Sequence, residues 1–278
     1  MTVQQHHTAP GGAPPLPVEP GLLSRALEVA GRLAGDAAEV ITATAGRDHR
    51  HGAAHEAGPF DWVTDTDRTL ERHTRRVLAS EFPGVPVVGE EFGADAGAGD
   101  TPYHWVVGPV DGTANYASGF PWCAYSLALV NPSGPVVGVV ADPGRAQIYA
   151  AARGWGVRAN GVPVRVAPRT ATGGLVCAEL SPGRAPGFAR RAAAAHVGVR
   201  VLGSSALAIT QVALGHAVAA VLDGFQEWDV AGAVCLATEA GALVVDGAGR
   251  PEPLPTDVMI VAVPGALDDV LGWWAAAS

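Results

Sequence analysis

The sequence predicts a mixed α+β and α/β fold in which helices and sheets pack as layers. Segments with helical periodicity come first, and strand-like segments joined by tight turns follow them. In the second half, strands and helices alternate, which is typical of layered folds. The composition, 48% hydrophobic and 16% charged over 278 residues, suits a globular chain with a full hydrophobic core.

The N-terminal part predicts a tail followed by two helices. Residues 1–20 are rich in Pro and Gly, which favours a disordered tail. From Leu23 to Ile41, apolar residues recur at spacings of three and four, which indicates one face of a long helix. Residues 46–61 lack periodicity and predict a mobile loop. A second helix is expected from about Thr66 to Phe82, before Pro83.

The rest of the chain is expected to form several strands and then strands that alternate with helices. Strands are expected at 85–88, 105–107, 125–130, 136–141 and 148–152, with a loop at 92–102; the last two strands form a hairpin. Further strands are expected at 175–180, 199–202, 218–222, 243–245 and 259–263, and helices at 188–196, 206–214, 230–240 and 266–274. We therefore expect one domain over 21–278, with an N-terminal half to about 165 and a C-terminal half from about 166.

Charge and cysteine content limit the function classes. The net charge is −9 and all 18 basic residues are Arg, so bulk attraction to nucleic acid is not expected and lysine chemistry is excluded. The three cysteines (Cys123, Cys177, Cys235) suggest neither a disulfide framework nor a zinc site, which favours a cytoplasmic protein. The N-terminus does not resemble a signal peptide, and no apolar run has the length of a membrane helix, so no membrane association is expected.

Four acidic segments stand at strand ends or helix starts. They are VTDTD (63–67), GEE (89–91), WVVGPVDGTANY (105–116) and WDVAGA (228–233). Open α/β sheets gather ligands at such positions, and oxygen ligands alone select hard cations such as Mg²⁺ or Mn²⁺. At Asp111-Gly112-Thr113, glycine lets backbone N–H groups approach an anion. Metal and anion together indicate phosphoryl transfer.

A simpler interpretation exists for each segment. Asp67 and Asp229, taken alone, would be ordinary helix caps, and Glu90-Glu91 after a strand would be a solvated turn. The order of all four segments along one chain favours a shared site.

In that order the four segments resemble the inositol monophosphatase family. Three further pieces are similar to it: VGVVADP (137–143) with Asn160-Gly161, LGSSA (202–206), and Glu239-Ala240-Gly241. The resemblance covers roughly residues 21–274. It implies a five-layer α-β-α-β-α sandwich of the inositol monophosphatase and fructose-1,6-bisphosphatase type. It also implies Mg²⁺-dependent hydrolysis of small phosphate monoesters, with Mn²⁺ as the alternative ion.

The resemblance also implies roles for individual residues. Metal ligands would be Glu90, the backbone carbonyl of Val110, Asp111 and Asp229. Catalytic residues that orient and deprotonate the attacking water would be Asp67, Glu90 and Thr113. The substrate would contact the N–H groups of Gly112 and Thr113, and Ser205, Asp223 and Asp229. The segment from Asp223 to Trp228 looks about one residue shorter than in relatives.

One position departs from the family pattern. The family's motif has Asp where this chain has Gly108, and the resemblance makes that Asp a bridge between two metal ions. Losing a bridging carboxylate weakens the hold on a pair of like charges. Three outcomes stay open: a second metal joins only with substrate phosphate, a neighbouring group fills the gap, or the site binds ligand without catalysis.

The resemblance implies a small phosphorylated polyol or sugar as substrate, and a homodimer. Inositol 1-phosphate, histidinol phosphate, fructose bisphosphate and 3′-phosphoadenosine phosphate lie within the family's range. We expect inositol monophosphate or a similar monophosphate, because no basic patch for a second phosphate is evident. The alternatives are a catalytically inactive relative that binds a sugar phosphate as a sensor or partner subunit, and a structural protein that keeps only the fold.

Overall fold

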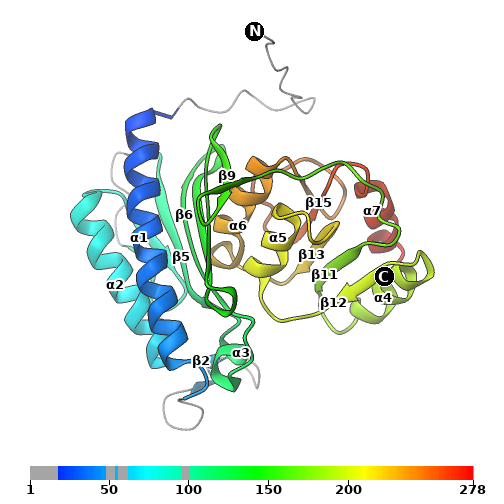
Figure 1. Ribbon diagram of the computed structural model, residues 1–278, viewed down its shortest axis with the longest axis horizontal. Coiled ribbons are helices and arrows are strands. Elements are labelled where there is room, and N and C mark those ends of the chain that lie inside the picture. Colours follow the sequence, from blue (N-terminus) through cyan, green and yellow to red (C-terminus); the bar gives the residue numbers. More distant parts are fainter. Residues whose placement is uncertain (1–17, 48–53, 56–61, 96–100, 278) are drawn as a thin grey trace.

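A computed structural model describes residues 18–47, 54–55, 62–95 and 101–277. Most of the predicted tail, residues 1–17, lies outside the described part, as do 48–53 and 56–61 of the predicted loop. The first described helix begins at Pro20, inside the predicted tail. The elements form five layers, helix–sheet–helix–sheet–helix, which confirms the predicted sandwich (Figure 1).

The first two layers are a helix pair and a large sheet. Helices α1 (Pro20–Thr44) and α2 (Asp65–Glu81) pack against one face of an eight-stranded sheet. Its strands, in spatial order, are β10 (Val162–Val164), β9 (Gly156–Ala159), β8 (Gln147–Ala152), β7 (Gly134–Asp142), β6 (Ala124–Asn131), β5 (His104–Asp111), β3 (Val87–Gly89) and β4 (Gly93–Ala94). The central strands are buried on both faces and read as apolar runs, because helices cover each face.

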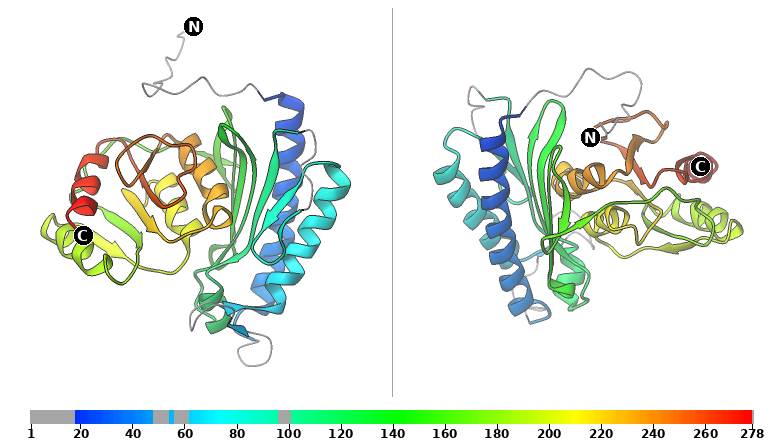
Figure 2. Two further views of the ribbon diagram at one scale, coloured as in Figure 1. Left: turned by 180° about the vertical axis from the view of Figure 1, so that it is seen from behind. Right: turned by 45° about the horizontal axis from the view of Figure 1, so that its top comes forward.

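The middle layer consists of α5 (Ser205–Ala213) and α6 (Glu227–Ala240), which lie between the two sheets (Figure 2). Helix α6 approaches the large sheet very closely. A Cβ atom at Gly138 would lie 2.3 Å from the Gly232 carbonyl oxygen, and one at Gly232 would lie 2.6 Å from Ser126 Oγ. Glycine at both positions therefore lets the backbones of α6 and the sheet pack in contact.

The last two layers are a smaller mixed sheet and the outer helices. The strand order is β12 (Gly198–Arg200), β11 (Leu175–Glu179), β13 (Ala219–Asp223), β15 (Val258–Ala262) and β14 (Leu243–Asp246). Strands β12, β11 and β13 run parallel, and β15 pairs antiparallel with β13 and β14. Helices α4 (Ala185–Ala194) and α7 (Leu267–Ala275) cover its outer face (Figure 1).

Most predicted elements are present, including the hairpin of β7 and β8. Two predicted loops are wrong in part: β1 (Ala54–His55) lies within 46–61 and pairs with β2 (Trp62–Val63), and β4 lies within 92–102. The prediction omitted the short helix α3 (Thr113–Ser118) and strands β9 and β10. None of the described helices is long and apolar enough to cross a membrane.

Candidate functional site

The site lies where two parallel strands of the large sheet end. Strands β3 and β5 pair in parallel with Gly89 opposite Val107, so their C-terminal ends reach the same edge of the sheet. Glu90 follows β3, and Asp111 is the last residue of β5. Strand direction therefore places Glu90 and Asp111 at the same edge of the sheet.

Asp67 is both a helix cap and a member of the site. Its backbone lies in the first turn of α2, and its Oδ2 accepts a hydrogen bond of 2.9 Å from the Thr64 N–H in a capping box. Its Oδ1 accepts the Thr113 hydroxyl at 3.4 Å. The capping interpretation is thus correct, and one oxygen still faces the predicted catalytic threonine. Burial raises the pKa of Asp67 to about 6.

Asp229 repeats this arrangement on α6. Its Oδ2 accepts the Gln226 N–H at 2.7 Å, which caps the helix. In the described part of the chain, Oδ1 has no hydrogen-bond partner. Burial raises the pKa of Asp229 to about 6. Each of these two aspartates therefore uses one oxygen to stabilise a helix start and leaves the other available to the site.

Glu90 has a carboxyl group without a hydrogen-bond or ion-pair partner among the described residues. Although the residue is exposed to solvent, many protein atoms surround its carboxyl group. This desolvation, followed by the charges of Asp229, Asp67, Glu91 and Asp111, raises the pKa of Glu90 to about 9. A carboxyl group surrounded by like charges and without a cationic partner is the feature expected of a cation ligand.

Asp111 joins the two sheets. Its Oδ2 accepts hydrogen bonds from the Ser204 hydroxyl and from the Ala206 N–H at 3.0 Å, and its Oδ1 accepts the Ser205 N–H at 3.2 Å. These donors stand at the start of α5, where backbone N–H groups lack helical partners. Burial, followed by the charge of Asp229, raises the pKa of Asp111 to about 8.

The turn after Asp111 is built around a glycine and leads directly into a short helix. Gly112 has a φ of +89°, and a Cβ atom there would lie 2.8 Å from the Gly203 carbonyl oxygen, so only glycine fits. Thr113 begins helix α3, and its hydroxyl donates to the Val110 carbonyl oxygen at 2.8 Å. The first N–H groups of α3, like those of other helices, have no intrahelical partner.

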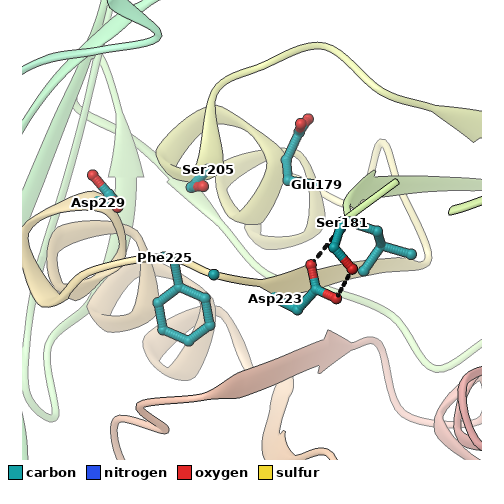
Figure 3. A pocket seen from close by; sticks show the side chains of 8 residues that line it. Glu179, Ser181, Ser205, Asp223, Phe225 and Asp229 are labelled. Atoms are coloured by element: carbon teal, nitrogen blue, oxygen red, sulfur yellow. Dashed lines mark hydrogen bonds between the residues drawn. The ribbon is translucent and has the colours of Figure 1, made fainter. Parts of the chain in front are cut away.

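A cleft of about 600 Å³ lies beside these groups. Predicted substrate residues Ser205, Asp223 and Asp229 line it, together with Glu179, Leu180, Ser181, Gly224 and Phe225. Figure 3 shows Asp229 and Ser205, from the first turns of two helices, on one side and Asp223 with Ser181 on the other. Asp223 accepts the Ser181 N–H at 2.5 Å and the Ser181 hydroxyl at 2.9 Å.

The carboxylate oxygens are suitable ligands for a cation, but they do not form a complete coordination site. Asp67, Asp111 and Asp229 lie close enough to raise the pKa of Glu90, and none of the described residues that line the cleft is basic. Yet within the described ranges no three His, Cys, Asp or Glu side chains are already arranged to hold an ion.

The space beside Gly108 is filled by backbone. Gly108 pairs with Ser126 in the sheet, and the register shifts between Gly108 and Asp111. A Cβ atom at Gly108 would lie 2.7 Å from the Trp228 carbonyl oxygen in the first turn of α6. A side chain at this position therefore requires α6 or β5 to move.

Sequence reasoning missed several residues that shape the site. Ser204 precedes a predicted helix, and its hydroxyl accepts the Leu207 N–H at 3.2 Å, so an N-cap search would have found it. Asn115 donates to the carbonyl oxygens of Trp122 at 2.8 Å and Leu202 at 2.7 Å. Glu179 accepts the Leu202 N–H at 2.9 Å. Asn115 lies in the acidic segment 105–116 singled out above, which assigns it no role, and nothing in the local sequence marks Glu179, because its partner is distant in the chain.

Comparisons with known proteins agree with the resemblance. The model of the inositol monophosphatase family matches residues 22–272. The chain is 35% identical over 211 residues to the Nus factor SuhB of Xylella fastidiosa, covering 71% of this chain and 74% of that protein. It is 34% identical over 267 residues to the inositol-1-monophosphatase SuhB of Mycobacterium tuberculosis, covering 88% and 89%.

Solved structures share the fold. The extragenic suppressor protein suhB of Bartonella henselae superposes with a TM-score of 0.84 at 25% identity, covering 90% of this chain and 98% of that one. An IMPase/NADP phosphatase complexed with Mg²⁺ and phosphate has the same fold, with a TM-score of 0.78 at 20% identity, covering 90% and 95%.

Proposed function

Because the chain belongs to the inositol monophosphatase family, we propose that it hydrolyses a small phosphate monoester with the help of Mg²⁺. One observation carries the proposal: the Glu90 carboxyl group, which has no partner among the described residues, is surrounded by Asp67, Asp111 and Asp229. Such a cluster is costly to keep ionised unless a cation joins it.

The proposed ligands are Glu90, the Val110 carbonyl oxygen, Asp111 and Asp229. They offer only oxygen atoms, which suits Mg²⁺, with Mn²⁺ as the alternative. When bound, the ion supplies positive charge against the phosphoryl oxygens and the leaving group. Asp111 Oδ1 accepts a single hydrogen bond, so one of its lone pairs remains for the ion while the bonds from α5 hold the carboxylate in place.

The chain's own groups then have distinct tasks. The N–H groups of Gly112 and Thr113, at the start of α3, hold the phosphate. Asp67 and Thr113, joined by a 3.4 Å hydrogen bond, orient the attacking water, and Asp67 or Glu90 accepts its proton. The raised pKa of Asp67, about 6, suits a group that accepts a proton near neutral pH.

The cleft favours a polyol rather than a second phosphate. Its lining contains the carboxylates Glu179, Asp223 and Asp229 and the hydroxyls of Ser181 and Ser205. These groups accept hydrogen bonds from hydroxyls and repel an additional anion. We therefore propose inositol monophosphate, or a similar polyol, sugar or histidinol phosphate, as the substrate.

A second candidate function is a catalytically inactive member that binds a sugar phosphate as a sensor or partner subunit. Gly108 favours it, because the resemblance places a bridging carboxylate there and the Trp228 carbonyl oxygen occupies that space. Under either function we propose a cytoplasmic homodimer that binds neither nucleic acid nor membrane, in line with the acidic net charge of −9.

Phosphate release separates the two candidates. The assay uses inositol 1-phosphate, histidinol phosphate and fructose bisphosphate with Mg²⁺ or Mn²⁺, and compares the wild type with Glu90→Gln. A phosphatase releases phosphate in the wild type and loses at least about 100-fold of its rate in the variant. An inactive member binds a monophosphate without releasing phosphate. A protein that does neither contradicts both proposals.

A further inference from the structure

The turn that carries Glu90 is held by a buried carboxylate on a different element. Glu71 of α2 has no exposed surface. Its Oε2 accepts the Glu91 N–H at 2.7 Å, and its Oε1 accepts the Phe92 N–H at 3.3 Å. The two N–H groups belong to the residues directly after Glu90, so the backbone of this turn is tied to α2.

The glycine before Glu90 is shaped around the same carboxylate. A Cβ atom at Gly89 would lie 2.3 Å from Glu71 Oε1 and 2.5 Å from its Cδ. Its backbone does not adopt a left-handed conformation, so lack of space is what excludes a side chain here. The first residue of the Gly-Glu-Glu segment is thus glycine because Glu71 packs directly against it.

An ion pair within α2 extends this network. Arg75, one turn further along α2, donates from Nε to Glu71 Oε1 at 2.8 Å. Its Nη1 donates to Asp95 Oδ1 at 2.7 Å, and Asp95 Oδ2 accepts the Val87 N–H at 2.9 Å. The network therefore fixes both strands that flank the turn, β3 and β4, to one helix.

The same helix face carries Asp67. Asp67 and Glu71 are four residues apart, so they lie on one side of α2 in successive turns. Asp67 accepts the Thr113 hydroxyl while Glu71 holds the Glu90 turn. Helix α2 thus sets the position of Glu90 relative to Asp67, the two carboxylates proposed to act on the same water.

We propose that Glu71 is a positioning residue that holds the Glu90 turn in place for metal binding and proton transfer. The inference rests on the proposed function for its catalytic part. Glu71 is fully buried and acts through the backbone of Glu91 and Phe92. Weakening it displaces Glu90, so more Mg²⁺ is needed for half-maximal activity, while KM for the phosphate monoester changes less.

The first test replaces Glu71 with glutamine, which keeps the shape but has one acceptor oxygen fewer. Glu81→Gln is the matched control, because Glu81 lies at the end of the same helix and pairs with Arg32 at 3.0 Å on the surface. We expect the Glu91 amide to exchange its hydrogen at least roughly tenfold faster in Glu71→Gln only. The Mg²⁺ concentration for half-maximal activity rises in the same variant.

A second pair of variants keeps the proposal testable if Glu71→Gln does not fold. Gly89→Ala places a methyl group against the Glu71 carboxylate and should destabilise the protein in urea unfolding. In a Glu71→Ala background that clash is gone, so adding Gly89→Ala should lower the free energy of unfolding much less. If Gly89→Ala lowers the free energy of unfolding equally in both backgrounds, the result contradicts the packing of Gly89 against Glu71.

The outcomes separate this inference from the proposed function. A Glu91 amide that exchanges at the same rate in Glu71→Gln and Glu81→Gln overturns the anchoring role. Faster exchange with unchanged Mg²⁺ dependence overturns the catalytic part. A wild type that neither binds Mg²⁺ nor releases phosphate overturns the proposed function and that catalytic part, while amide exchange still decides whether Glu71 anchors the turn.

Discussion

The Ser204 hydroxyl donates a hydrogen bond to Asp111 Oδ2, although the two residues are 93 positions apart in the chain. Asp111 ends a strand of the large sheet, and Ser204 caps the helix that leads away from the small sheet. This contact joins the proposed metal ligand to the segment that lines the substrate cleft.

Ser204→Ala and Ser205→Ala should differ in their effects on stability and on KM. Ser204 caps α5 and bonds Asp111, so its loss should lower the free energy of unfolding by about 1 kcal/mol in urea titrations. Ser205 contacts Asp111 only through its backbone N–H, which alanine retains, so its variant should keep wild-type stability and raise KM. Equal stability losses in the two variants contradict the capping role of Ser204.

Asp67 and Asp65 offer a second matched pair on one helix turn. Asp67→Asn should lower the rate of phosphate release by about 10²–10⁴-fold, because an amide neither accepts a proton from the attacking water nor orients it as a carboxylate does. Asp65 is exposed, and Asp65→Asn should leave the rate within about twofold of the wild type, since surface changes away from a site have small effects. A comparable loss of rate in both variants would place the catalytic carboxylate elsewhere.

Gly108→Asp should restore the family's carboxylate but also destabilise the metal-free protein. The new Cβ atom would meet the Trp228 carbonyl oxygen, so the metal-free variant should lose about 1–3 kcal/mol of stability. Gly108→Ala carries the same Cβ atom without a carboxylate and is the control. Thermal unfolding with and without Mg²⁺ measures both: Mg²⁺ should stabilise Gly108→Asp more than Gly108→Ala.

If Mg²⁺ raises the melting temperature of both Gly108 variants equally, the added carboxylate does not reach the ion. In that case position 108 lies outside the metal site, and the resemblance misplaces the bridging ligand.

The three cysteines should resist thiol reagents in the folded protein. All are buried; burial raises the pKa of Cys177 to about 11 and of Cys123 to about 12, and it raises the pKa of Cys235 as well. At pH 8 the reactive thiolate is therefore scarce, and raising the pH to 9 should leave the reaction slow. A chromogenic disulfide should count three thiols only after denaturation; rapid reaction of the native protein contradicts this burial.

Periodicity predicted most of the fold, because helices such as α1 bury one face and the central strands are continuous apolar runs. Short elements such as α3 and β4 escaped prediction, since they depend on turns and pairing rather than on pattern. The acidic segments identified Asp67, Glu90, Asp111 and Asp229 because the resemblance fixes their order, and the structure brings their charges together.

The supporting residues could not be predicted in the same way. Glu71 is one of many charged residues on α2, and Asn115 belongs to the acidic segment 105–116 but has no assigned role there. Their partners, Glu91 and Leu202, are respectively 20 and 87 positions away. These contacts form only because α2 packs against β3 and α3 lies next to the start of α5, which the sequence alone does not show.

Calorimetric titration with Mg²⁺, in the presence of inorganic phosphate, tests the central claim most directly. The wild type should bind Mg²⁺, and Glu90→Gln and Asp229→Asn should each weaken the binding by at least about tenfold, since each removes a charged ligand. Glu81→Gln should bind as the wild type does. A wild type that shows no Mg²⁺ binding, or Glu90 and Asp229 variants that bind as tightly as it does, would contradict the account.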